Sequence, residues 1–361
     1  MLVLPILAAS HVRAQNQAVR PSGSQAVLDQ GKADWFAMRT KSAQQQLIAA
    51  TKSPATAAEA HYWLGRIYDF KGNKAEGAFP GFHEEVSYRP RAEVEFKAAG
   101  VPRPEWIAEA EAAENALKTA DAAIAKLPTD ASASAIRTAI EARIKLRPDP
   151  MSYIAGANML LARQADLPFV LRLAAEGKIA GERFIRENES SYKLDGKVLA
   201  SLDRNAATFA DIAGWALFLQ GDLAGAEARL AEGARLFRSN DINNQLHLAE
   251  LSVRKGNQDT AEEHYLNVLS LAYAPDTAQQ RFQAQTALFT LRAKTGESFD
   301  ESKSWLARTL ERKREERREA LVNNMQGRRV PALVLKDLQG NAVDLRAERG
   351  NVILLNFFSA W

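Results

Sequence analysis

The chain has 361 residues, of which 46% are hydrophobic, and this is typical of two or three domains with ordinary apolar cores. With 47 basic and 44 acidic residues the formal net charge is only +3, which gives no global attraction to nucleic acid. The sequence contains no cysteine, and this excludes disulfides, thiolate metal sites, lipidated cysteines and cysteine nucleophiles within residues 1–361.

The N-terminus begins with a short apolar stretch, residues 2–9. Val12 and Ala14 occupy the −3 and −1 positions of a cleavage after Ala14, so residues 1–14 are expected to be a signal peptide. The stretch is short and no Lys or Arg precedes it, and a start codon assigned too far downstream would explain both. A frayed N-terminal arm is the alternative. The polar residues 15–31 that follow are expected to form a linker.

Residues 32–324 carry the pattern of a helical domain. This segment is rich in Ala, Leu, Glu and Arg, and its apolar residues recur at spacings of three and four. The proline and aromatic content of residues 79–106 departs from that pattern and favours a long ordered loop or an inserted segment. Further helices are expected at 105–127, 130–146, 277–294 and 299–322. No stretch after the N-terminus has the ~20 apolar residues of a membrane-spanning helix, so no membrane span is expected.

Three segments share a spacing of small residues, glycines and large apolar residues. They are residues 60–78, 211–237 and 246–275. The turn glycines of the second and third segments, Gly221 and Gly256, are spaced by 35 positions. A glycine at this place is expected to end the first helix of each pair in a left-handed cap, and Gly72 is its counterpart in the first segment. Small residues on both helices let the two backbones approach, and large apolar residues fill the space beside them.

This pattern resembles the tetratricopeptide repeat, a pair of helices with a period of about 34 residues. The resemblance covers about half of the helical region and implies a mainly α, solenoid-like domain that binds a protein or peptide partner. It does not indicate which partner. The packing implies that Ala226 and Ala261 are buried where the two helices of each pair meet.

The sequence changes character after Gly327. Residues 330–361, VPALVLKDLQGNAVDLRAERGNVILLNFFSAW, contain β-rich segments separated by turns at 339–341 and 348–350. This pattern predicts a hairpin followed by a central strand at 352–358. Because a lone buried strand has no partners, residues 328–361 are interpreted as the first β-elements of an α/β domain that is incomplete at Trp361.

These elements resemble the opening of the thioredoxin-like redoxin family, in the branch of membrane-anchored or periplasmic thiol–disulfide oxidoreductases. The matching residues are Pro331, Asp337, Leu338, Gly340, Leu345, Arg349, Gly350, Asn356, Phe357 and Trp361. In that branch a Trp stands directly before Cys-x-x-Cys. The resemblance therefore implies a redox site immediately after Trp361, whose first thiol would be activated at a helix N-terminus.

The resemblance also implies the function of the longer protein. It would be an extracytoplasmic, periplasmic-type oxidoreductase that acts on thiol or disulfide protein substrates in redox homeostasis, while residues 1–361 alone would be inactive. Two alternatives stay open. The peroxiredoxin branch shares the opening but carries a different cysteine loop, and Trp361 favours the Trp-Cys branch. An adaptor without redox activity is the second alternative. No cofactor is expected for any of these readings.

The remaining candidates favour structural roles. The five histidines show no paired metal-ligand spacing, so no metal site is expected; they are His11, His61, His83, His247 and His264. Residues 83–91, HEEVSYRPR, resemble an acid–base cluster but have no nucleophile beside them, which favours a hydrogen-bonded loop. No catalytic residue is therefore assigned within residues 1–361.

Two further patterns are interpreted in the same way. The charge run at residues 310–321 suggests nucleic acid or an acidic membrane, but its interleaved Glu residues, with Arg312 and Glu316 at helix-pair spacing, favour a solvated helix. Four aromatic residues are expected to belong to the repeat core rather than to a cofactor site; they are Trp215, Phe218, Phe237 and Tyr265.

Overall fold

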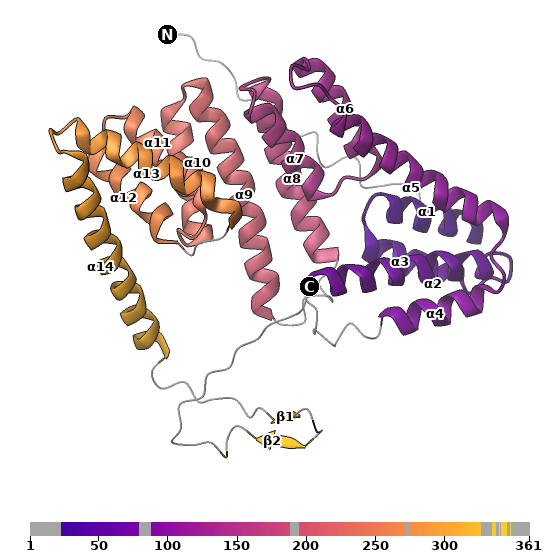
Figure 1. Cartoon of the computed structure of the whole chain (residues 1–361). Helices are drawn as coiled ribbons and strands as arrows, with labels where there is room; N and C mark the ends of the chain where they lie inside the picture. Colours follow the sequence, from indigo (N-terminus) through magenta and orange to yellow (C-terminus); the bar gives the residue numbers. More distant parts are fainter. Residues whose placement is uncertain are drawn as a thin grey trace, which may run out of the picture. The chain divides into compact units, whose positions relative to one another are not determined.

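The structure is a computed structural model that describes residues 23–78, 88–187, 195–271 and 275–325, together with short pieces between 334 and 347 (Figure 1). Fourteen α-helices, one short 3₁₀ helix and two short strands make up its regular structure in these residues. The chain divides into two compact units, residues 1–237 and 238–361. The mainly α class is confirmed, whereas the solenoid and thioredoxin-like assignments stay predictions.

The first unit contains ten helices in its described residues, coloured indigo to pink in Figure 1. They are α1 (Ser24–Phe36), α2 (Thr40–Ala50), α3 (Ala57–Ala78), α4 (Tyr88–Ala99), α5 (Pro104–Ala125), α6 (Ala133–Leu146), α7 (Pro150–Leu161), α8 (Leu167–Glu187), α9 (Asp195–Gln220) and α10 (Leu223–Phe237). Most pack against the helix that follows in the chain. One apolar core joins α1–α5 and includes Trp63, and a second joins α6–α9 and includes Phe209; both are among the largest fully buried side chains.

The helical region begins earlier than expected. Helix α1 starts at Ser24, inside the expected linker 15–31, because Leu28 and Trp35 fall on one face and are buried. The helix also approaches α2 closely: a Cβ on Gly31 would lie 2.8 Å from Leu47 Cγ. The expected signal peptide, residues 1–14, lies outside the described residues.

Residues 79–106 were expected to form a long ordered loop or an inserted segment, and the loop alternative is wrong for the second half. Residues 88–99 form α4, which buries Tyr88, Ala92 and Ala99 against the first core. Pro90 is tolerated because it lies in the first turn, where its missing N–H would have no partner within the helix. Residues 79–87 lie outside the described part of the chain, and with them most of the 83–91 cluster.

The expected helix pairs are present at the two later segments. Gly221 (φ +86°) ends α9 and Gly256 (φ +77°) ends α11 (Ile242–Arg254), both in the left-handed conformation. Ala226 and Ala261 are fully buried, as expected. In the first segment the expected turn is wrong: α3 continues through Gly72 to Ala78, since one glycine inside a well-packed helix costs only about 1 kcal/mol.

A long-range contact joins α2 to the end of α8. The Glu187 carboxylate accepts hydrogen bonds from the backbone N–H groups of Lys41 (2.5 Å) and Ser42 (3.3 Å), and Thr40 Oγ1 donates to the Glu187 carbonyl at 3.2 Å. The carboxylate thus satisfies free N–H groups at the N-terminus of α2. Since the bonded residues are about 146 positions apart, this unit contains more than the nearest-neighbour contacts of a simple solenoid.

The second unit contains α11, α12 (Gln258–Ser270), a 3₁₀ turn (Pro275–Thr277), α13 (Ala278–Ala293), α14 (Phe299–Met325) and the strands β1 (Val334–Lys336) and β2 (Ala342–Asp344). The strands pair antiparallel, with Leu335 opposite Val343. The expected central strand at 352–358 lies outside the described residues.

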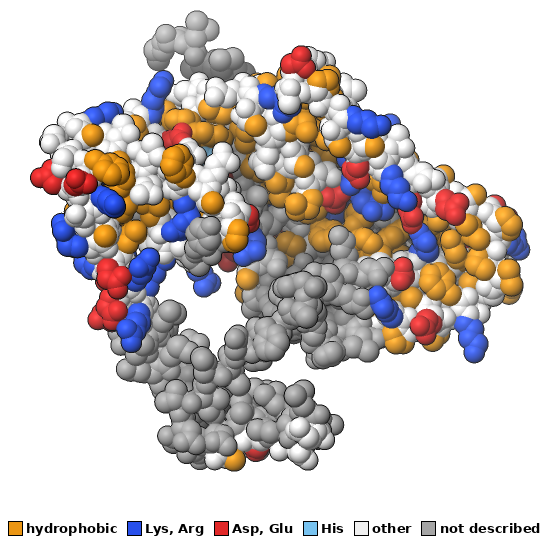
Figure 2. Space-filling view, in the orientation of Figure 1, with side chains coloured by type: hydrophobic (Ala, Val, Ile, Leu, Met, Phe, Trp, Pro, Cys, Tyr) orange, Lys and Arg blue, Asp and Glu red, His pale blue; other side chains and the backbone are white. Residues whose placement is uncertain are grey.

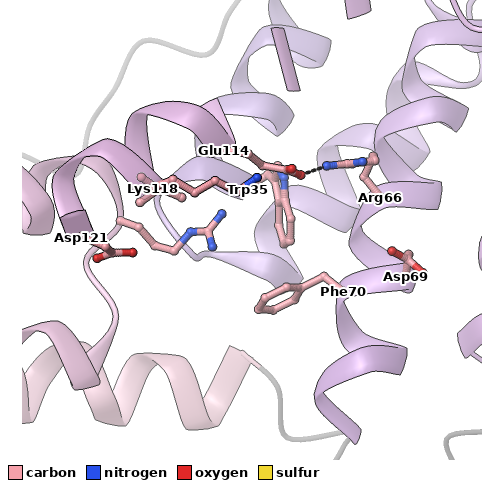
Figure 3. A pocket seen from close by; sticks show the side chains of 9 residues that line it. Trp35, Arg66, Asp69, Phe70, Glu114, Lys118 and Asp121 are labelled. Atoms are coloured by element: carbon pink, nitrogen blue, oxygen red, sulfur yellow. Dashed lines mark hydrogen bonds and ion pairs between the residues drawn. The ribbon is translucent and has the colours of Figure 1, made fainter. Parts of the chain in front are cut away.

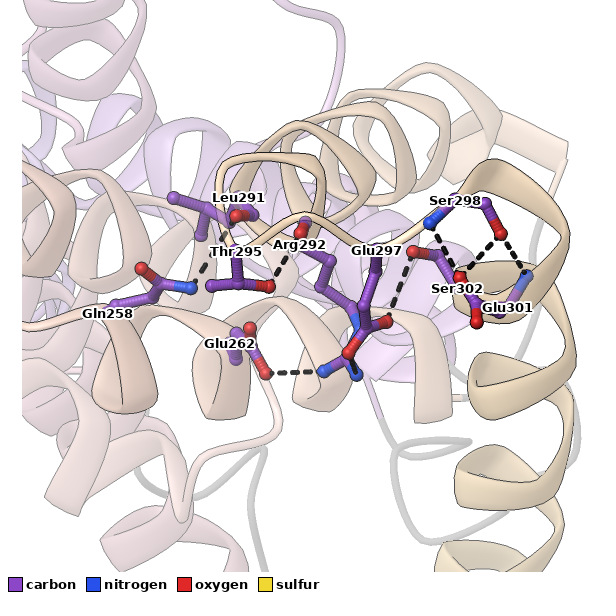
Figure 4. A network of polar contacts seen from close by, with 9 residues as sticks. All are labelled: Gln258, Glu262, Leu291, Arg292, Thr295, Glu297, Ser298, Glu301 and Ser302. Atoms are coloured by element: carbon purple, nitrogen blue, oxygen red, sulfur yellow. Dashed lines mark hydrogen bonds and ion pairs between the residues drawn. The ribbon is translucent and has the colours of Figure 1, made fainter.

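A largely buried cation, Arg292, connects α12, α13 and α14 (Figure 4). Arg292 donates to Glu262 Oε2 at 3.1 Å and to Glu297 Oε2 at 2.9 Å, and its guanidinium lies 3.6 Å from the centre of the Trp305 ring. Ser298 and Glu301 then cap the start of α14: the Ser298 N–H donates to the Glu301 carboxylate, and the Glu301 N–H donates back to Ser298 Oγ.

Candidate functional site

A cavity of about 360 Å³ lies in the first unit, between α3 and α5 (Figure 3). Its wall is built from four parts of the chain and contains three apolar and six charged residues. They are Trp35 from α1; Arg66, Asp69 and Phe70 from α3; Glu114, Leu117, Lys118 and Asp121 from α5; and Arg147, which follows α6. This volume falls in the range of pockets that hold small ligands.

The inner surface of the cavity is aromatic. Trp35 and Phe70 meet edge to face, with ring centres 5.2 Å apart and an interplanar angle of 77°. Leu117 is buried beside them. Such a surface favours a planar apolar group, because aromatic rings contact one another well in edge-to-face and offset geometries.

Lys32 holds the three helices around the cavity. Its ammonium donates to Glu59 of α3 at 3.0 Å and to Glu109 of α5 at 2.6 Å, and it lies 5.5 Å from the Trp63 ring centre. Burial alone would lower the pKa of Lys32, but the hydrogen bonds and charges of the two carboxylates outweigh it and raise the pKa. The positions of α1, α3 and α5 are therefore fixed independently of the cavity wall.

Two ion pairs engage acids on the cavity wall. Arg66 pairs with Glu114 across the gap between α3 and α5, as Figure 3 shows. Arg143 of α6 donates to Asp121 at 2.5 Å and lies 3.3 Å from Asp149. Asp69 also has an interaction partner.

The two remaining cations differ from these. In the described parts of the chain, neither the Lys118 ammonium nor the Arg147 guanidinium makes a hydrogen bond or an ion pair. Burial lowers the pKa of Arg147, and the neighbouring Arg143 lowers it further. The cavity thus combines an apolar surface with positive charge that the protein does not neutralise by direct contact.

The histidines are not brought together. His61 Nδ1 lies 2.6 Å from Glu95, and His264 Nδ1 lies 3.0 Å from Gln245 Oε1 in the other unit, where burial lowers its pKa. His247 is half-buried, and His11 and His83 lie outside the described residues. Across the described ranges no group of three or more His, Asp and Glu could hold a metal ion.

The other sequence candidates take varied positions. Tyr265 is buried, as expected for a core residue, and burial raises its pKa to about 12. The rings of Trp215 and Phe218 stack with their centres 4.6 Å apart, and both side chains are only half-buried, as is Phe237. Of the four aromatic residues expected in the core, only Tyr265 is buried there.

The charge run lies on α14, where acidic and basic side chains alternate at the surface (Figure 2). Arg312 and Glu316 form the expected pair at 3.6 Å, and both side chains are more than 60% exposed. A solvated helix face is the reading that this arrangement supports.

The cavity was not among the sites expected from the sequence. A signal for it exists in α5, where Glu114, Leu117, Lys118 and Asp121 recur at helical spacing and place three charged residues on a face that also carries an apolar one. All ten residues of the thioredoxin-like match, from Pro331 to Trp361, lie outside the described residues.

Among the helices that the structure describes, none has both the length and the apolar character needed to cross a membrane. Neither a scan against protein-family models nor a search of curated proteins finds a match to the chain.

Proposed function

We propose that the helical region binds a protein or peptide partner and presents it to a thioredoxin-like domain that begins at residues 328–361. The complete protein would then be a thiol–disulfide oxidoreductase of the periplasm or another extracytoplasmic compartment. The observation that carries the redox assignment is the ordered match from Pro331 to Trp361 in the sequence. The partner-binding assignment is supported by a unit whose described residues are mainly helical and by a cavity that contains two cations, Lys118 and Arg147, without a directly bonded partner among the described residues.

The chemistry implied by the resemblance is exchange between two thiols and a disulfide. A thiolate at the start of the helix after the 352–358 strand would attack one sulfur of the substrate disulfide and form a mixed disulfide. The second cysteine would attack that bond, so that the substrate leaves as two thiols and the protein keeps the disulfide. The helix N-terminus stabilises the attacking thiolate and lowers its pKa.

The experiment compares residues 1–361 with a protein that continues through the reading frame after Trp361. Insulin reduction by dithiothreitol is followed by turbidity. The longer protein is expected to accelerate it, and a Cys→Ser change at the first cysteine should abolish the acceleration. Residues 1–361 should give only the background rate, since they contain no cysteine.

A second function, an adaptor without redox chemistry, is favoured by the same cavity. A reading frame without cysteine in the positions directly after Trp361 would refute the redox proposal and leave the adaptor. Insulin reduction by residues 1–361 above the background rate would contradict the redox proposal, because that proposal requires the cysteines after Trp361.

A further inference from the structure

The cavity between α3 and α5 has an unbalanced pattern of charge. Its three acids are all engaged: Glu114 by Arg66, Asp121 by Arg143, and Asp69 by a further interaction. The cations Lys118 and Arg147, by contrast, make no hydrogen bond or ion pair to another described residue. A positively charged ligand would therefore have to displace an existing ion pair. An anionic ligand, by contrast, could form new ion pairs with Lys118 and Arg147.

The position of Arg147 strengthens this asymmetry. Its guanidinium is partly buried next to Arg143, and Arg143 is itself held by Asp121 and Asp149. A desolvated cation beside another cation is costly, because burial removes its hydration, and the nearby carboxylates of Asp149, Glu114 and Asp121 offset this cost only in part, so that the pKa of Arg147 stays lowered. An anion bound at Arg147 would relieve both costs, and the planar guanidinium can donate two parallel hydrogen bonds to a carboxylate.

Lys118 contributes from a separate element. It follows Leu117 on α5 and lines the same cavity as Arg147, which comes after the end of α6. Its side chain is exposed, so its ammonium keeps the freedom to follow a ligand. The cavity therefore offers two kinds of contact. Its two cations can bind a negatively charged group, and its aromatic surface can contact an apolar one.

We propose that this cavity is a binding site for an organic anion, with its planar apolar body against Trp35 and Phe70 and its negative group between Lys118 and Arg147. Such an anion can come from a free small molecule or from the acidic side chain of a protein segment that also carries an aromatic residue. Binding of an acidic protein segment rests on the proposed function, whereas binding of a free small molecule does not. The volume of about 360 Å³ accommodates either.

The test measures binding by isothermal titration calorimetry to the full chain. The small-molecule probe is 2-naphthoate, and its neutral isostere 2-naphthamide is the control for apolar contact alone. The peptide probe is acetyl-Gly-Phe-Glu-Gly-amide, whose only charge is the Glu carboxylate, with the Gln peptide as its control. Each anionic probe that binds is expected to bind about tenfold more tightly than its neutral control, since hydrogen bonds to charged groups are the stronger ones.

Matched variants locate the site. Lys118→Gln and Arg147→Gln should each weaken naphthoate binding by about fivefold or more, as expected for loss of one charge-assisted contact. Lys126→Gln removes the same charge just beyond the end of α5, outside the cavity wall, and should leave binding unchanged. Circular dichroism and thermal unfolding establish that each variant is folded. Because Lys118 is exposed, its variant remains informative even where Arg147→Gln does not fold.

Each outcome decides the proposal. Binding of naphthoate but not of the Glu peptide supports a free small anion, and binding of the Glu peptide but not the Gln peptide supports a protein segment. The proposal is overturned when neither anionic probe binds at millimolar concentration, when the neutral controls bind equally well, or when both cavity variants bind like the wild type. Insulin reduction by the longer protein uses none of these probes, so the two proposals fail separately.

Discussion

Replacement of Arg292 by Met should destabilise the second unit strongly. Only 13% of the Arg292 side chain is exposed, and its guanidinium bridges Glu262 of α12 and Glu297, two residues before α14, over the face of Trp305. Met keeps an apolar chain of similar length against Trp305 but removes the charge and all hydrogen-bond donors. The two carboxylates then face each other without a cation.

The magnitude follows from how little of the network water can reach. The exposed fractions are 17% for Glu262 and 33% for Glu297. Removing one partner of a buried pair costs about 3–5 kcal/mol, and the partial exposure of Glu297 reduces this to about 2–4 kcal/mol. With a denaturant slope of about 2 kcal/mol per molar urea, the unfolding midpoint should fall by about 1–2 M.

The assay is urea unfolding of the full chain, read by hydrogen exchange so that α12–α14 are followed separately from the first unit. Arg312→Met is the matched control, because the Arg312–Glu316 pair is exposed and should contribute only about 0–1 kcal/mol. A variant that combines Arg292→Met with Glu262→Gln and Glu297→Gln tests the cause. If unpaired carboxylates are responsible, the combined variant should regain much of the lost stability.

Two results would refute this reasoning. The first is a midpoint shift for Arg292→Met no larger than that of Arg312→Met, which would mean that water screens the network despite its burial. The second is a combined variant no more stable than Arg292→Met alone. The loss would then come from packing against Trp305 rather than from charge.

Three further predictions follow from the described contacts. Ala261→Trp should overpack the junction of α11 and α12 and lower the free energy of unfolding by about 1–3 kcal/mol, and an unchanged melting temperature would contradict the packing described. Burial lowers the pKa of His264 from 6.5, so below that pH the unfolded chain binds a proton that the folded chain does not. The melting temperature should therefore fall from pH 7 to pH 5, and it should fall less in His264→Gln; an equal fall in both proteins would contradict this. Glu187→Gln should accelerate exchange of the Lys41 and Ser42 amides relative to wild type, and equal rates would show that the α2–α8 link contributes nothing.

Helices with strong periodicity and clear end signals were predictable from the sequence. Helices α5, α6 and α13 lie within two or three residues of the expected ranges, since periodic Ala-rich segments act locally. The start of α6 is also fixed locally, because the Ser132 side chain accepts a hydrogen bond from the Ala135 N–H. Gly221 and Gly256 were identifiable for the same reason. Their left-handed conformation is a local requirement that glycine meets best.

The errors arise where distant contacts decide. Gly72 stays helical in a helix whose core residues Trp63 and Ile67 are fully buried, and α4 forms where Tyr88 and Ala92 find a partner in α3. The cavity depends on side chains from four elements spread between Trp35 and Arg147. No local pattern states that these elements meet, so only the charged residues interleaved on α5 hinted at a site.

The hydrogen bonds between Glu187 and the start of α2 limit how this unit can change in length. A solenoid gains or loses whole repeats freely, because each repeat contacts only its neighbours. Here the removal of any helix pair between α2 and α8 would carry Glu187 away from the N–H groups of Lys41 and Ser42. The number of helices between α2 and α8 is therefore constrained, because these helices must bring the end of α8 back to the start of α2. Duplication or deletion of a helix pair would have to be matched by a new cap for α2, which makes this unit resistant to the usual route by which repeat arrays diverge.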